Sequence, residues 1–76
     1  MPRRITIEER PVRMACCETH MRYAVMFDGK EFSELYWNMR GYNGYLPTAT
    51  GDRLDIGEVG ISAYRREAAA LNREMR

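Results

Sequence analysis

Two turn dipeptides, Asp28-Gly29 and Asn43-Gly44, constrain the fold of this chain more than any other feature. Asn, Asp and Gly adopt positive φ at low cost, so both dipeptides are typical of two-residue β-hairpin turns. The segment between them is rich in aromatic residues and contains the only tryptophan, Trp37. We therefore expect the residues before this segment to form strands that pair with it, and the residues after it to form a helix that covers it.

The length and the charge of the chain limit the classes of protein it can belong to. Its 76 residues suffice for a single domain, 1–76, with one small core. Twelve basic and eleven acidic residues give a net charge of +1, which argues against a protein built mainly to grip nucleic acid. Two cysteines, no apolar run of membrane-spanning length and no signal peptide lead us to expect a soluble cytoplasmic protein that does not bind membranes.

Three segments before the first turn dipeptide have the composition of strands. Residues 3–8 alternate polar and apolar side chains, and residues 12–17 form a weaker candidate. Pro11 lies between them and is expected to interrupt any ladder, because proline lacks the backbone N–H. Residues 21–27 alternate more clearly, and four of their side chains would share one face: Met21, Tyr23, Val25 and Phe27.

The segment between the turn dipeptides fits either a strand or a helix. As a helix over 31–40, it would be capped by Asp28 and would carry apolar side chains at helical spacing. As a strand, it would pair with residues 21–27 through the Asp28-Gly29 turn, with a β-bulge between Phe32 and Leu35. We favour the strand, because hairpin signals bracket the segment and tyrosine and tryptophan favour sheets.

The C-terminal segment has the pattern of an amphipathic helix. Ser62 is a suitable N-cap, and residues 63–76 contain neither glycine nor proline. One apolar stripe repeats at spacings of three and four, formed by Ile61, Tyr64, Ala68, Leu71 and Met75. The sequence thus predicts an α+β fold, a small and mostly antiparallel sheet of three to five strands with this helix packed across one face. The alternative adds a helix at 31–40.

The aromatic segment also supplies the best candidate for a functional surface. In the strand interpretation, Leu35, Trp37 and Met39 face the helix, and the intervening side chains face solvent. Tyrosine, tryptophan and arginine dominate the hot spots of protein interfaces. We therefore predict a partner-binding surface formed by Tyr36, Asn38, Arg40, Tyr42 and Tyr45. Its partner would be another protein or a second copy of the chain, as in small inhibitors and adaptors of phages and mobile elements.

Two other functions compete with protein binding. Tyr36, Tyr42 and Arg40 could instead stack on single-stranded nucleic acid. Cys16, Cys17 and His20 could bind a structural zinc ion, although adjacent cysteines on an extended chain point to opposite faces and no fourth ligand is evident. With one histidine and no glycine-rich phosphate loop, we expect neither enzymatic activity nor a cofactor.

Overall fold

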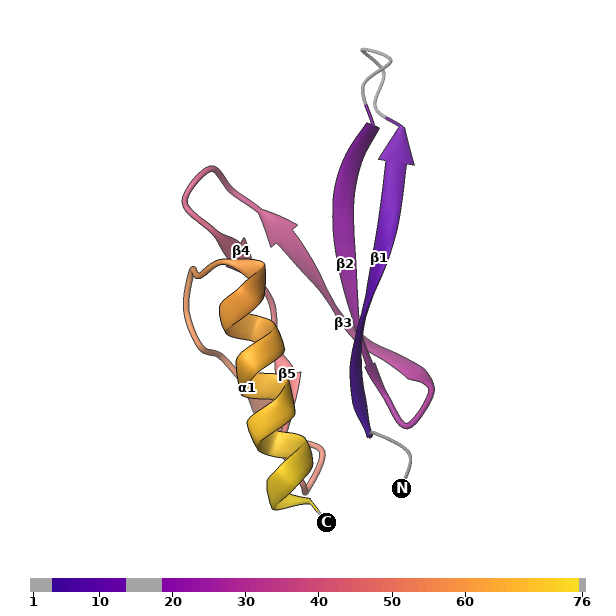
Figure 1. The fold of residues 1–76 in the computed structure, drawn as a ribbon, viewed down its shortest axis with the longest axis vertical. Coiled ribbons are helices and arrows are strands. Elements are labelled where there is room, and N and C mark those ends of the chain that lie inside the picture. The colour runs from indigo at the N-terminus through magenta and orange to yellow at the C-terminus, as the bar shows by residue number, and fades with distance from the viewer. Residues whose placement is uncertain (1–3, 14–18, 76) are drawn as a thin grey trace.

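The computed structural model describes residues 4–13 and 19–75 and has an α+β architecture (Figure 1). One antiparallel sheet contains, in spatial order, β1 (Ile5–Arg13), β2 (Thr19–Phe27), β3 (Lys30–Trp37) and β4 (Tyr42–Asn43). A second sheet pairs β5 (Leu46–Pro47) with β6 (Arg53–Leu54), and helix α1 (Ile61–Glu74) follows. The predicted antiparallel sheet and C-terminal helix are confirmed, and the alternative helix at 31–40 is wrong because β3 occupies those residues.

The first predicted hairpin turn is confirmed. Asp28 and Gly29 have φ values of 52° and 83°, as a type I′ turn requires at both central positions. Further along, Val25 pairs with Ser33 but Met26 pairs with Glu31, so β3 contains one extra residue. The expected bulge is therefore present, with Phe32 itself as the extra residue, and it sets Leu35 opposite Tyr23.

Strand β1 lies at the edge of the sheet and continues through Pro11, contrary to the sequence-based expectation. The Ile5 main chain points away from β2, because its N–H and its carbonyl both bond to Asn72. The regular antiparallel register then turns the main-chain groups of Ile7, Glu9 and Pro11 toward the same open edge. Proline is tolerated there because no bond to β2 is lost. The strand predicted at 12–17 begins inside β1, and residues 14–18 lie outside the described residues.

The second hairpin turn lies at residues 38–41, and the prediction that Asn43-Gly44 forms it is wrong. The Asn38 N–H donates to the Gly41 carbonyl at 3.1 Å, and Met39 has a φ of 76°. Gly44 does not adopt positive φ, but a Cβ atom there would lie 2.6 Å from the Glu34 carbonyl oxygen. Glycine is thus required at position 44 by the close approach of the backbone to β3.

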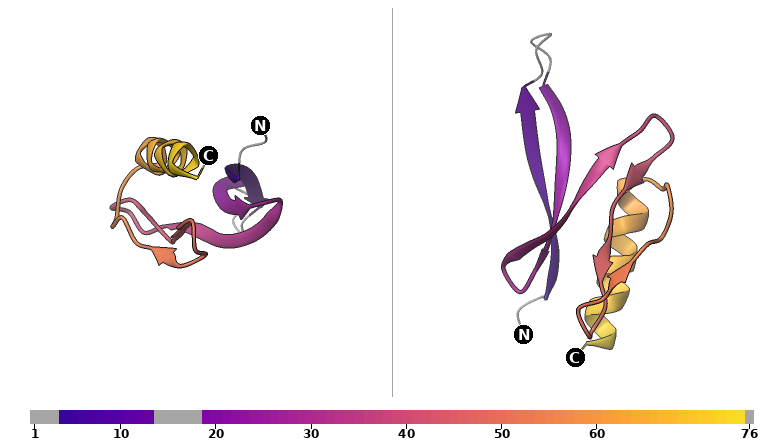
Figure 2. Two further views of the ribbon diagram at one scale, coloured as in Figure 1. Left: turned by 90° about the horizontal axis from the view of Figure 1, so that it is seen from below. Right: turned by 180° about the vertical axis from the view of Figure 1, so that it is seen from behind.

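The helix lies on the inner side of the curved layer of strands (Figure 2). Tyr64 and Ala68 are its buried residues, and the other members of the predicted apolar stripe pack against the same core, so the stripe is confirmed. The helix begins after Gly60, and Ser62 lies within its first turn, so the predicted N-cap is wrong. The core cluster joins the strands to the helix and consists of Ile5, Val25, Leu35, Leu46, Tyr64 and Ala68.

Candidate protein-binding surface

Large apolar side chains are exposed on β3, on the turn after it and just before β5. We call these residues the exposed aromatic surface, and they are Tyr36, Trp37, Met39 and Tyr45. They surround the end of β3 and lie on both of its faces, with Tyr36 on one face and Trp37 on the other. Trp37 is 56% exposed and Met39 is 86% exposed. Four large side chains exposed within ten residues are a candidate binding surface, because exposed apolar side chains that cluster often mark interaction sites.

The exposure of Trp37 and Met39 differs from the prediction that both face the helix. Strand alternation does place Trp37 on the same face as the buried Leu35. Trp37 stands at the end of β3, however, where its ring packs on Tyr42 with 5.1 Å between centroids and lies outside the core cluster. Met39 belongs to the turn, so strand alternation does not determine its direction.

Tyr36 and Tyr45 line a shallow groove of about 350 Å³ on the opposite face of β3 from Trp37. The guanidinium of Arg22 lies 5.6 Å from the Tyr36 ring centre, and that of Arg53 lies 5.5 Å from the Tyr45 ring centre. The nearby Glu34 carboxylate acts as a hydrogen-bond acceptor and raises the pKa of the Tyr36 hydroxyl. The other residues that line the groove are Ser33, Glu34, Asn43, Gly44 and Asp55.

Asn38 and Arg40 occupy the turn between β3 and β4, with different roles. The Asn38 side-chain oxygen accepts hydrogen bonds from the N–H groups of Arg40 and Gly41, at 3.0 and 3.1 Å. Asn38 therefore fixes the turn. The Arg40 side chain is 82% exposed and lies 4.0 Å from the Glu58 carboxylate, which is a loose ion pair. Arg40 is available for a partner, whereas Asn38 positions it.

Tyr42 differs from the other predicted site residues because it is half-buried. Its ring contacts Tyr23 edge-on with 5.2 Å between centroids, and burial raises the pKa of its hydroxyl. Its N–H donates to the Val59 carbonyl, and its own carbonyl accepts a hydrogen bond from Tyr64. The Tyr42 ring thus packs against Tyr23 and Trp37 and is not fully exposed to solvent.

Sequence patterns could have found one of the groove's two acidic residues. Glu34 lies two residues before Tyr36 on β3, and side chains two apart share a face of a strand. Asp55 follows β6, and no local pattern predicts that it reaches the same groove. The structure therefore brings Tyr36 and Tyr45 together beside two carboxylates, with Arg40 on the adjoining turn.

The metal hypothesis remains a prediction. Within residues 4–13 and 19–75, no three His, Cys, Asp or Glu side chains are grouped so that they could hold a metal ion. Cys16 and Cys17 lie outside the described residues. In the same ranges, no helix has both the length and the apolar character needed to cross a bilayer. Comparisons with protein-family models, with curated proteins and with solved structures find no match to this chain.

Proposed function

We propose that this protein is a non-enzymatic interaction module that binds a protein partner through the exposed aromatic surface and Arg40. The observation that carries the proposal is the exposure of four large apolar residues within positions 36–45. A small protein that exposes a tryptophan and two tyrosines gains stability when a partner covers them. Their residue types, with Arg40 adjacent, are those that contribute most to binding energy at protein interfaces.

Single-stranded nucleic acid is the less favoured partner. Tyr42, one of the predicted stacking residues, already packs on Tyr23 and Trp37. Two carboxylates, Glu34 and Asp55, line the groove and offset the charge of Arg22 and Arg53, which lie against the Tyr36 and Tyr45 rings. The groove therefore lacks the excess of positive charge that attracts phosphate groups. Charges of both signs beside exposed aromatic rings suit a protein partner that presents polar and apolar side chains.

The proposal is tested by quantitative affinity capture from cell extract with the wild-type protein, Tyr36→Ala and Trp37→Ala. Arg66→Ala is the matched control, because Arg66 is exposed on α1 and outside the surface. We expect a protein captured by the wild type and by Arg66→Ala, but captured weakly or not at all by the two aromatic variants. Thermal unfolding of each variant must show that the fold is retained.

Light scattering over a wide concentration range shows whether the partner is a second copy of the chain. A dimer that dissociates in Trp37→Ala would make the partner a second copy of the chain, and Trp37, the single tryptophan, reports its burial by fluorescence. Equal capture by the wild type and both aromatic variants would contradict the proposal. Tight binding to oligothymidine that weakens steeply with salt would favour the nucleic-acid alternative instead.

A further inference from the structure

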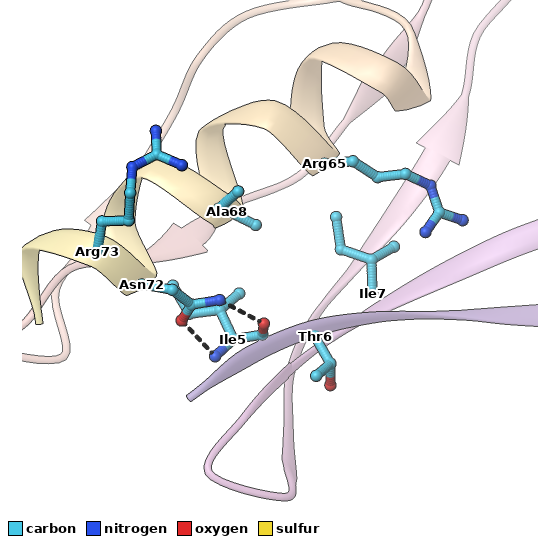
Figure 3. Close-up of a pocket in the computed structure, with 8 residues that line it drawn as sticks. Ile5, Thr6, Ile7, Arg65, Ala68, Asn72 and Arg73 are labelled. Carbon is cyan, nitrogen blue, oxygen red and sulfur yellow. Dashed lines mark hydrogen bonds between the residues drawn. The ribbon is translucent and has the colours of Figure 1, made fainter. Parts of the chain in front are cut away.

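A second recess lies on the other side of the molecule's core, between the open edge of β1 and helix α1 (Figure 3). Its volume is about 490 Å³. At one end the strand and the helix are tied together, because the Asn72 side chain accepts a hydrogen bond from the Ile5 N–H and donates one to the Ile5 carbonyl, both at 2.9 Å. The recess, called here the β1 groove, is lined by Ile5, Thr6, Ile7, Arg65, Ala68, Ala69, Asn72 and Arg73.

The main-chain groups on this edge are open over a short and defined stretch. Ile5, Ile7, Glu9 and Pro11 direct their main-chain groups away from β2, as the register and the Asn72 bonds show. The Asn72 side chain already bonds to the N–H and the carbonyl of Ile5, and Pro11 has no N–H to donate. Among the described residues, no hydrogen bond reaches the N–H or carbonyl of Ile7 or Glu9 from any partner. Two residues thus present four unused groups to an added strand.

The side chains of the groove favour an acidic occupant. Its apolar wall is formed by Ile7 and by the small residues Ala68 and Ala69, which leave room beside the helix. Two arginines, Arg65 and Arg73, stand along it, and none of its lining residues is acidic. Arg65 lies 3.7 Å from the Glu9 carboxylate just beyond the groove, so part of its charge is already neutralised and Arg73 is the second positive group. The two arginines and Glu9 together leave a net positive charge beside the groove. Charge complementarity therefore selects a peptide with an acidic side chain.

A second copy of β1 is a poor occupant, because the three antiparallel registers centred on Ile7, Glu8 and Glu9 are each unfavourable. Pairing centred on Glu8 sets two Glu8 carboxylates opposite each other. Centring on Glu9 does the same for Glu9, and places Pro11, which lacks an N–H, opposite Ile7. Centring on Ile7 sets Glu9 against Ile5, whose groups are held by Asn72. These three registers therefore favour a strand of different sequence.

We propose that an extended peptide with an acidic side chain, from a protein other than this one, adds to β1 at Ile7 and Glu9 and lies in the β1 groove. Asn72 and Pro11 limit the added strand to a single position along β1. Its backbone supplies the hydrogen bonds, and Arg65 and Arg73 select its charge. This site is separate from the exposed aromatic surface, because no residue of one belongs to the other.

Backbone amide NMR with a strand-forming probe peptide, acetyl-TVDVT-amide, tests the proposal directly. In the free protein, the amides of Ile7 and Glu9 should exchange with solvent faster than those of Thr6 and Glu8, which face β2. On titration to millimolar peptide, the Ile7 and Glu9 amide signals should move and their exchange should slow. A peptide with lysine in place of aspartate should bind about fivefold more weakly.

Two variants at one position separate main-chain pairing from side-chain effects. Glu9→Pro removes the outward N–H at a position equivalent to that of Pro11, and it should abolish peptide binding. Glu9→Ala is the matched control. It keeps the N–H and frees Arg65, so binding should be retained or strengthened. If the Ile7 and Glu9 amides do not respond to millimolar peptide, or if both variants bind like the wild type, the proposal is overturned and Asn72 and Pro11 only shield the edge from self-association.

Discussion

At the scale of single residues, Tyr64 is one of the side chains that link the helix to the rest of the fold. It is fully buried, and its hydroxyl shares its one proton between the Tyr42 carbonyl at 3.2 Å and the Gly57 carbonyl at 3.1 Å. Tyr64→Phe should lower the free energy of unfolding by about 1–2 kcal/mol, because it removes the donor that the two carbonyls share. Urea denaturation measures the change. Tyr45→Phe, at an exposed position, is the control, and an equal effect in both variants would refute the role given to Tyr64.

The same hydroxyl predicts how stability depends on pH. Burial raises the pKa of Tyr64, and the negative charge of Asp55 raises it further. Unfolded tyrosine ionises near its ordinary pKa of about 10, whereas folded Tyr64 keeps its proton to higher pH. Unfolding then releases a proton in this range, so the contribution of Tyr64 to stability should be complete below about pH 10 and be lost as the pH rises above it.

Tyr64→Phe should lose less stability than the wild type as the pH rises above about 10. Part of the decline should persist in the variant, because burial also raises the pKa of Tyr42. Denaturant titrations at a series of alkaline pH values provide the measurement. Parallel curves for the two proteins would show that Tyr64 ionises alike in the folded and unfolded states.

Gly44 allows a test that distinguishes a hairpin turn from a close backbone contact. A Cβ atom there would lie 2.6 Å from both the Glu34 carbonyl oxygen and the Leu35 Cδ2 atom. Gly44→Ala should destabilise the protein by about 1–3 kcal/mol or more, since the backbone has to move apart. Gly44→Asn should be at least as harmful, whereas asparagine would be tolerated at a turn position with positive φ. A stable Gly44→Asn protein would restore the turn originally predicted at Asn43-Gly44.

At the scale of secondary-structure elements, local patterns predicted what depends on local sequence. The Asp28-Gly29 turn, the pairing of β2 with β3 and the apolar stripe of α1 all follow from spacing alone. The second turn could not be located in this way, because Asn38 closes it by bonding to two following N–H groups, and Gly44 resembles a turn glycine for another reason. Because the turn lies at residues 38–41, Trp37 pairs with Tyr42.

The candidate site was predictable to the same extent. Alternation along β3 is sufficient to predict that Tyr36 is exposed. The exposure of Arg40 follows from its position in the turn beyond the strand. Tyr42 was assigned to solvent because the register of β4 depends on the turn, and the actual turn pairs Tyr42 with Trp37. The β1 groove depends on Asn72 meeting Ile5, a contact between residues 67 positions apart that no short-range pattern contains.

Helix α1 starts without a side-chain cap, which predicts a simple stabilising substitution. Gly60 is the N-cap residue with a φ of −71°, no side-chain hydrogen bond caps the helix, and its first turn has no acidic residue. A Cβ atom at position 60 would meet nothing within 4 Å. Gly60→Asp should therefore raise the free energy of unfolding by about 0.5–1 kcal/mol, through a hydrogen bond to the first free N–H groups and a favourable charge at the positive helix end.

The matched comparison for this substitution is Gly60→Ala. Alanine adds the same Cβ atom without a hydrogen-bond acceptor, so it should give no gain or a small loss. Raising the salt concentration should reduce the advantage of aspartate, because the part due to charge is screened. An alanine variant as stable as the aspartate variant would show that capping does not limit this helix.

At the scale of the whole molecule, support for the strands is uneven. The described residues span 43 × 23 × 18 Å, and the β1–β2 hairpin extends beyond the rest along the long axis (Figure 1). Strand β3 pairs with β2 only from Tyr23 to Phe27, so residues 19–22 of β2 pair with β1 alone. The core cluster includes Ile5 and Val25 at the base of this hairpin. The hairpin is thus supported by a third strand and a core at one end only.

Isolated two-stranded ribbons are marginally stable in water, and native proteins open locally where few buried contacts hold them. We therefore expect the amides of Val12 and His20 to exchange with solvent about 100-fold faster than those of Thr6 and Met26. Val12 pairs with His20 and Thr6 pairs with Met26, and both pairs are at positions where the main chains of β1 and β2 hydrogen-bond to each other. A difference in exchange rate between the two pairs therefore cannot come from a difference in hydrogen bonding. Residue-resolved hydrogen exchange makes the comparison within one sample. Equal protection at both ends would mean that the hairpin opens as a single unit with the core, and that the third strand adds nothing to the stability of the ribbon it joins.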